Sequence, residues 1–184
     1  MQQQPTATAP AMQPQPVKAL AFVLDEASAE RAGETPFINE TGEVIATIVR
    51  AEYRRNETAS HAMVFRFEDE GGKRGTVSLT YLKKDGVTPE FGANFVNAML
   101  YLIGLPGFSW ADGVDDRGQQ VQVAQELTGQ RIGLVVESVK NMNDDGHHLE
   151  LRQVFDPASR CTASEAKNGS KAEAVDKLLK RLMA

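Results

Sequence analysis

The fold is decided by the stretch Glu43-Val44-Ile45-Ala46-Thr47-Ile48-Val49-Arg50-Ala51-Glu52-Tyr53. It follows a turn-forming cluster, Asn39-Glu40-Thr41-Gly42, and it is rich in β-branched residues, which favour strands. Alternation with a period of two places one set of side chains on a common face: Ile45, Thr47, Val49, Ala51 and Tyr53. The pattern predicts a β-strand from Glu43 to Tyr53.

Two further strands are predicted directly after it. The segment Ala62 to Glu68 places Met63, Phe65 and Phe67 on one face, and we interpret Phe65 and Phe67 as core residues. Gly71-Gly72 then predicts a tight hairpin turn, because glycine adopts positive φ readily. The next segment, Arg74 to Leu82, has Val77, Leu79 and Tyr81 on a common side and ends at the turn Lys83-Lys84-Asp85-Gly86.

The apolar spacing then changes from two residues to about 3.6. From Asn94 onward this predicts a helix, which Gly104 and Pro106 end. A long loop is predicted from Leu105 to Gly129. The last two predicted strands, Arg131 to Val139 and His147 to Phe155, are joined by a turn at Asn143-Asp144-Asp145-Gly146.

The predicted order is three strands, a helix and two strands. This order indicates a mainly β fold, a five-stranded OB-type barrel in which the helix lies between strands three and four. We assign this domain to residues 17–155, in which Val17 to Leu24 either adds an edge strand or packs on the barrel. Residues 1–16 form a Gln- and Pro-rich lead that we expect to be disordered, and residues 156–170 a polar linker. Residues 171–184 predict an amphipathic helix that docks on the barrel, a second copy or a partner.

Composition limits the class of protein. A chain of 184 residues supports one domain with tails, and its single cysteine, Cys161, forms no internal disulfide. It has no apolar run of the roughly 18 residues that cross a membrane and no apparent secretion signal, so we expect a cytoplasmic protein. The net charge is −5, yet residues 44–84 hold eight basic and five acidic residues. Residues 85–130 hold one basic and six acidic residues, so the basic charge is concentrated in the first three strands.

No set of residues indicates catalysis. The pairs Asp115-Asp116, Asp144-Asp145 and His147-His148 lack the spacing of a metal site, and Asp144-Asp145-Gly146 fits a hairpin turn. No nucleophile motif or phosphate-binding loop is present. We therefore predict no catalytic residues, no bound metal and no cofactor.

Basic residues alternate with aromatic ones along the first three strands, a pattern typical of proteins that bind single-stranded nucleic acid. Arginines and lysines contact phosphates in such proteins, and aromatic rings stack on bases. Tyr53 and Tyr81 are candidates either for the core or for stacking, and Trp110 is either a lid over the barrel mouth or a surface plug. The predicted binding residues are Arg50, Tyr53, Arg54, Arg55, Arg66, Lys73, Arg74, Tyr81, Lys83 and Lys84.

Several short motifs, distributed from Pro36 to Ala166, resemble a family of phage and prophage proteins. They are Phe37 to Gly42 leading into Ala51-Glu52-Tyr53, Gly71-Gly72, Asn97-Ala98-Met99 to Gly104-Leu105, Leu127 to Arg131, Val154-Phe155-Asp156 and Thr162 to Glu165. The resemblance implies an OB-fold single-stranded DNA-binding protein of phage DNA replication or recombination, acting in the host cytoplasm. It does not extend to the acidic, Phe-tipped tail of many such proteins, because this chain ends in Lys180-Arg181-Leu182-Met183-Ala184.

Two functions follow as hypotheses. The first is sequence-tolerant binding of single-stranded DNA by the outer face of strands one to three. The alternative is a protein-interaction module in which the barrel is a scaffold. Its C-terminal helix makes a homo-oligomer or docks a phage replication, recombination or virion protein.

Overall fold

The structure of the chain is a computed structural model that describes residues 24–26, 29, 33, 36–115 and 117–184. It forms two units, Met1–Glu34 and Thr35–Ala184, which we describe separately. In the first unit the N–H of Ala29 donates to the carbonyl of Asp25 at 3.0 Å, as in one helical turn. The predicted disordered lead, 1–16, and all but the last residue of the predicted segment Val17 to Leu24 lie outside the described residues.

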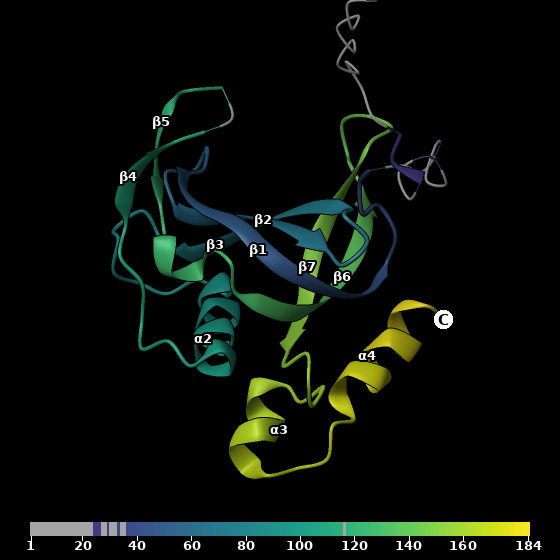
Figure 1. Cartoon of the computed structure of the whole chain (residues 1–184). Helices are drawn as coiled ribbons and strands as arrows, with labels where there is room; N and C mark the ends of the chain where they lie inside the picture. Colours follow the sequence, from purple (N-terminus) through teal and green to yellow (C-terminus); the bar gives the residue numbers. More distant parts are fainter. Residues whose placement is uncertain (1–23, 27–28, 30–32, 34–35, 116) are drawn as a thin grey trace, which may run out of the picture. The chain divides into compact units, whose positions relative to one another are not determined.

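The second unit is mainly β, with one antiparallel sheet of seven strands and three short α-helices among its described residues (Figure 1). The strands and helices predicted from the sequence are confirmed to within a few residues. In chain order the elements are β1 (Gly42–Arg55), β2 (His61–Asp69), β3 (Arg74–Leu82), α2 (Gly92–Ile103), β4 (Ala111–Val114), β5 (Gln120–Val123), η1 (Gln125–Leu127), β6 (Arg131–Lys140), β7 (His147–Phe155), α3 (Ala163–Asn168) and α4 (Ala174–Leu182).

The long strand β1 organises the sheet. It pairs with β2 along most of its length, and its first residues, Gly42 to Thr47, also pair with β6. Beyond these neighbours, β3 pairs with β2 and β7 pairs with β6. The strands β3 and β7 come close to each other, but no ladder joins them in the described part of the chain. The sheet therefore curls into an open arrangement with a seam between β3 and β7.

The predicted alternation along β1 is wrong in its first half. Ala46 and Ile48 are buried, whereas Val49 is 50% exposed. The pairing of β1 with β2 shifts between Ile48 and Arg50, which is the irregularity of a β-bulge. Because a bulge adds one residue to one strand, it reverses which side chains face the core. Beyond it, Ala51 is buried.

The core lies between the sheet and α2. The prediction that Phe65 and Phe67 are core residues is confirmed, since they are 3% and 1% exposed. The N-terminus of α2 lies directly on β3, because a Cβ at Gly92 would overlap the carbonyl oxygen of Thr80. Gly104 ends the helix with a φ of 73°, a left-handed conformation that favours glycine.

The segment Leu105 to Gly129, predicted as a long loop, instead contains the β4–β5 hairpin and η1. Its apolar residues join the core: Val123, Ala124 and Leu127 are at most 4% exposed. The hairpin is attached to the sheet where Val123 pairs with Glu52 of β1. Each of its strands has four residues, the shortest length at which alternation indicates a strand, and the alternation of β5, Gln120-Val121-Gln122-Val123, was a signal that the sequence analysis missed.

The segment 156–170, predicted as a linker, contains α3. A capping box begins this helix: the side chain of Thr162 accepts from the N–H of Glu165, and the carboxylate of Glu165 accepts from the N–H of Thr162. The other oxygen of Glu165 accepts from the N–H groups of Glu173 and Ala174, both at 2.8 Å. One carboxylate thus stabilises the start of α3 and of α4.

The C-terminal helix α4 packs on the sheet of its own chain. The sequence left three docking surfaces open for this helix: the barrel, a second copy or a partner. Val175 is 2% exposed and lies in a cluster with Val135 and Phe155, the latter two fully buried. Four partly buried residues complete this cluster: Ile45, Leu178, Leu179 and Leu182. Figure 1 shows α4 beside β6, the strand that it contacts.

Candidate nucleic-acid interface

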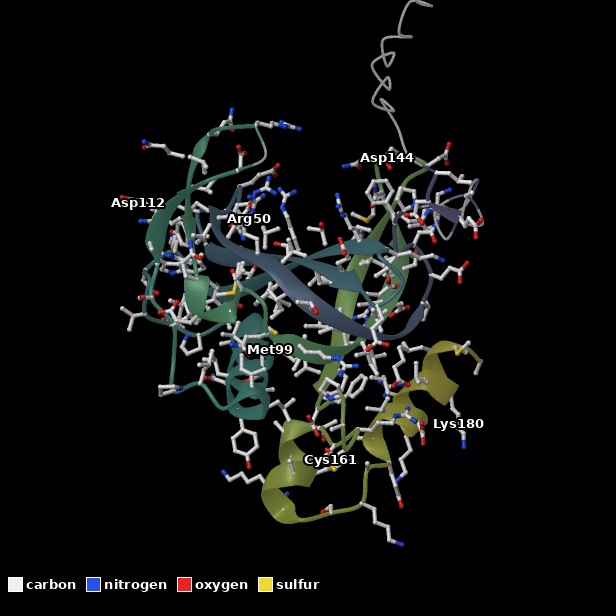
Figure 2. All side chains as sticks on the ribbon, in the orientation of Figure 1. Arg50, Met99, Asp112, Asp144, Cys161 and Lys180 are labelled. Atoms are coloured by element: carbon white, nitrogen blue, oxygen red, sulfur yellow. The ribbon has the colours of Figure 1, made fainter. Side chains whose placement is uncertain are left out.

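A groove of about 1140 Å³ lies over the outer face of β1, β2 and β3. The start of α2, the first residues of β7 and the segment Phe37-Ile38 form its borders. Pockets for small molecules measure roughly 300–1,000 Å³, so this groove is at least as large as such a pocket. In Figure 2, Arg50 lies near the β4–β5 hairpin and Asp144 in the loop between β6 and β7.

Arginines dominate the charge of the groove. Among the residues that the structure describes, five arginines, three glutamates and no lysine line it. Arginine is well suited to nucleic acids, because its planar guanidinium binds phosphate with two parallel hydrogen bonds and also stacks on bases. The groove arginines are Arg50, Arg54, Arg66, Arg74 and Arg152, and the glutamates are Glu68, Glu90 and Glu150.

The structure divides the predicted phosphate contacts into two sets. Four line the groove, namely Arg50, Arg54, Arg66 and Arg74. The other four lie outside it, at strand ends and in turns: Arg55, Lys73, Lys83 and Lys84. Arg152 of β7, which the sequence analysis missed, adds a fifth arginine. Its position across the seam from β3 depends on the curvature of the sheet, for which the local sequence carries no signal.

Ion pairs position most of the groove arginines. Arg74 pairs with Glu68 at 3.1 Å, and Arg152 pairs with Glu137 and Glu150 at 2.6 and 2.7 Å. Such partners restrict the side-chain rotamers, which lowers the entropy that a ligand contact would otherwise cost. Arg54 differs, because it is exposed and forms no ion pair with any residue that the structure describes.

Neither predicted stacking tyrosine lines the groove. Tyr53 and Tyr81 instead belong to an aromatic cluster with Trp110, whose ring lies edge-on to that of Tyr53 at 5.5 Å. The Tyr53 hydroxyl is 2.9 Å from Nδ1 of His61. Burial raises the pKa of Tyr81 above 10.0, and a hydrogen bond with Trp110 offsets only part of this effect. Trp110 packs against the core at this end of the sheet.

The groove has exposed aromatic residues of its own, which the sequence analysis did not select. Phe91 is 73% exposed and Phe37 is 60% exposed, and both line the groove. The Phe91 ring lies edge-on to that of Phe95, with 5.3 Å between the ring centres. The sequence contained one signal for Phe91. It precedes Phe95 by four residues, a spacing at which side chains are neighbours on a helix, although Phe91 itself lies outside the apolar stripe assigned to the helix.

The β4–β5 hairpin places Asp115 near Arg50, on the β1 side of the groove. Arg50 donates to the carbonyl of Val114 at 3.3 Å, which connects β1 to the hairpin. Beside Val114, hydrogen bonds from the backbone of Gln119 and Arg117 lower the pKa of Asp115, with further contributions from the charges of Arg117 and Arg50. The acidity predicted for residues 85–130 therefore lies partly beside the groove rather than on its floor.

Asp144 and His148, from two of the pairs considered as metal ligands, form hydrogen bonds at the turn between β6 and β7. Asp144 accepts from the N–H of Gly146 at 2.7 Å and from the side chain of Asn141 at 2.8 Å, as in the predicted turn. Nδ1 of His148 lies 2.7 Å from the Asn141 side-chain oxygen. Within the described residues, no three His, Cys, Asp or Glu side chains gather as metal ligands would.

Comparison of the sequence with protein-family models and with curated proteins finds no match. Among the described residues, no helix has both the length and the apolar character needed to span a membrane.

Proposed function

We propose that this chain binds single-stranded DNA, with little dependence on base sequence, through the arginine-lined groove on β1, β2 and β3. The observation that carries the proposal is the concentration of five arginines in one groove of a chain whose net charge is −5. Phosphate contacts supply most of the affinity of such proteins and are independent of base sequence.

The strand order supports the proposal. Within the sheet, β3, β2, β1, β6 and β7 follow one another in space, and α2 comes between β3 and β6 in the chain. We propose that these five strands form a partly open OB-type barrel, a fold that binds oligonucleotides on a comparable face. Because fold alone does not establish function, the weight rests on the groove residues. A relationship to phage single-stranded DNA-binding proteins, which the motifs suggested, is part of the same proposal.

The alternative hypothesis, a scaffold that docks a partner through the C-terminal helix, has less support. It required an unoccupied apolar face on α4, but Val175, Leu178 and Leu179 pack against the chain's own sheet. No other described feature favours it specifically.

The test is a titration of a fluorescently labelled oligo-dT strand with the full chain, followed by anisotropy at low and high salt. We expect binding that weakens as salt rises, because bound phosphates release counterions. An unlabelled duplex of equal length should compete poorly, since its bases are already paired and stacked. Absence of binding at low salt, in anisotropy and in a gel shift, would disprove the proposal.

A further inference from the structure

Two exposed phenylalanines lie beside opposite ends of β3. At its beginning, Phe37 forms a bridge with Arg74, and the N–H of Ile38 donates to the Arg74 carbonyl at 2.9 Å. At its other end, the N–H of Glu90 donates to the carbonyl of Tyr81 at 2.9 Å, and Gly92 touches Thr80. These contacts hold Phe91 beside the end of the strand.

The registers of the sheet place the groove arginines along the same direction. At the Phe37 end, Arg74 is opposite Glu68 of β2. In the middle row, Arg50 of β1 is opposite Arg66 of β2, and Arg66 is opposite Thr76 of β3. At the Phe91 end, Arg54, Ala62 and Thr80 form the corresponding row. The groove thus has an aromatic ring at each end and an arginine in three of the four rows between them; the fourth row, Glu52, Val64 and Ser78, has none.

We propose that Phe37 and Phe91 stack on bases at the two ends of the groove, and that a short single strand lies between them with its phosphates against the arginines. This inference rests on the proposed function. The chemistry favours nucleic acid over an apolar peptide, because two large exposed rings accompany five guanidinium groups. A base offers a π-face to each ring, whereas the phosphates match the positive charge.

The length of the strand follows from the length of β3. From Arg74 to Thr80 the strand advances six residues, or about 20 Å at about 3.4 Å per residue. A nucleic-acid strand with stacked bases advances about 3.4 Å per nucleotide, so the groove holds at most about six nucleotides. We expect the affinity for oligo-dT to rise steeply with the length of the strand up to about six nucleotides. For longer strands, the affinity of each binding site should change little.

The variants Phe37→Ala and Phe91→Ala test the stacking. Each should bind oligo-dT about 5- to 150-fold more weakly than the wild-type chain, the usual effect of losing one stacked base. A strand of equal length that lacks bases should bind all forms nearly alike, because only phosphate contacts remain. Tyr101→Ala is the matched control: Tyr101 is on α2 and 51% exposed, but does not line the groove. It should bind like the wild type.

The outcomes separate this inference from the proposed function. If the wild-type chain binds no strand at low salt, the proposed function fails and the inference with it. If the wild type binds oligo-dT and base-free strands equally, the stacking inference alone is wrong. Far-UV circular dichroism verifies the fold of each variant. If an alanine variant unfolds, Phe37→Leu or Phe91→Leu replaces it, because leucine keeps apolar volume but has no ring. Wild-type affinity in a folded leucine variant would also overturn the inference.

Discussion

Glu52 and Arg66 form an ion pair across the β1–β2 ladder, with 3.2 Å between Oε1 of Glu52 and Nε of Arg66. Glu52 is 9% exposed, and the same oxygen lies 2.5 Å from Nε of Arg50. One carboxylate, which does not itself line the groove, thus compensates two guanidinium groups that do.

The variant Glu52→Gln should lower stability and raise affinity for DNA. Without the carboxylate, two neighbouring positive charges lose a buried partner, which should reduce the free energy of unfolding by roughly 1–3 kcal/mol. The groove also becomes one unit more positive, so oligo-dT should bind more tightly at low salt. Urea unfolding and anisotropy measure the two effects. A folded variant with weaker binding would contradict the prediction.

Arg54→Gln should reduce the salt dependence of binding. Each phosphate contact to a single strand contributes about 0.7 to the slope of log K against log salt. Loss of Arg54 should therefore make this slope shallower by about 0.7, since the side chain is exposed and lines the groove. Lys180→Gln is the control: Lys180 is an exposed cation on α4, outside the groove, and its removal should leave the slope unchanged (Figure 2).

Glu165 should make stability depend on pH in the acid range. Burial raises the pKa of its carboxyl, but hydrogen bonds from the backbone of Thr162, Glu173 and Ala174 outweigh this and lower it from 4.5 to about 2. As pH falls, the carboxyl of Glu165 therefore binds its proton at a higher pH in the unfolded chain than in the folded chain. The stabilisation is complete above pH 4.5 and is lost as pH falls toward about 2.

Two substitutions at this position separate charge from capping. Glu165→Gln retains a capping side chain but has no proton to bind, so its urea midpoint should fall less steeply than that of the wild type below pH 4.5. Glu165→Ala removes the cap as well and should cost about 1–2 kcal/mol at neutral pH. Identical pH profiles for the wild type and Glu165→Gln would show that this carboxylate is not responsible.

Val175→Ala should destabilise the whole second unit rather than α4 alone. Val175 is 2% exposed against Val135 and Phe155, and losing its two methyl groups removes apolar contacts and leaves a cavity. We expect a loss of about 2 kcal/mol in the free energy of unfolding. Lys180→Ala, on the exposed face of the same helix, should change it by less than about 0.5 kcal/mol. A partner or oligomer lost on Val175→Ala with stability unchanged would revive the scaffold hypothesis.

The sequence predicted most elements of the second unit correctly, because their signals are local. Alternation, glycine turns and the change to a helical period located β1 to β3, α2, β6 and β7. The alternation of Met63, Phe65 and Phe67 also predicted their burial correctly. In β1 the same rule failed between Ile48 and Arg50, because the bulge there is set by pairing with β2 rather than by the residues of β1 itself.

The candidate site was predicted only in part. Charge counting indicated the basic strands, and four of the predicted residues line the groove: Arg50, Arg54, Arg66 and Arg74. Tyr53 and Tyr81 were selected because they alternate with basic residues, but they lie in the Trp110 cluster outside the groove. Phe37 and Phe91 were not selected, because each lies outside the strands and reaches the groove through contacts with β3.

The sequence by itself determined the order of β1, β2, β3, α2, β6 and β7 and the basic character of the first three strands, since both depend on residues close together in the chain. Only the tertiary structure decided which of those residues share a surface. The bulge in β1, the seam between β3 and β7, and the position of Arg152 depend on pairing between distant segments. A ligand contacts the surface that these pairings create, so the groove is a property of the folded chain.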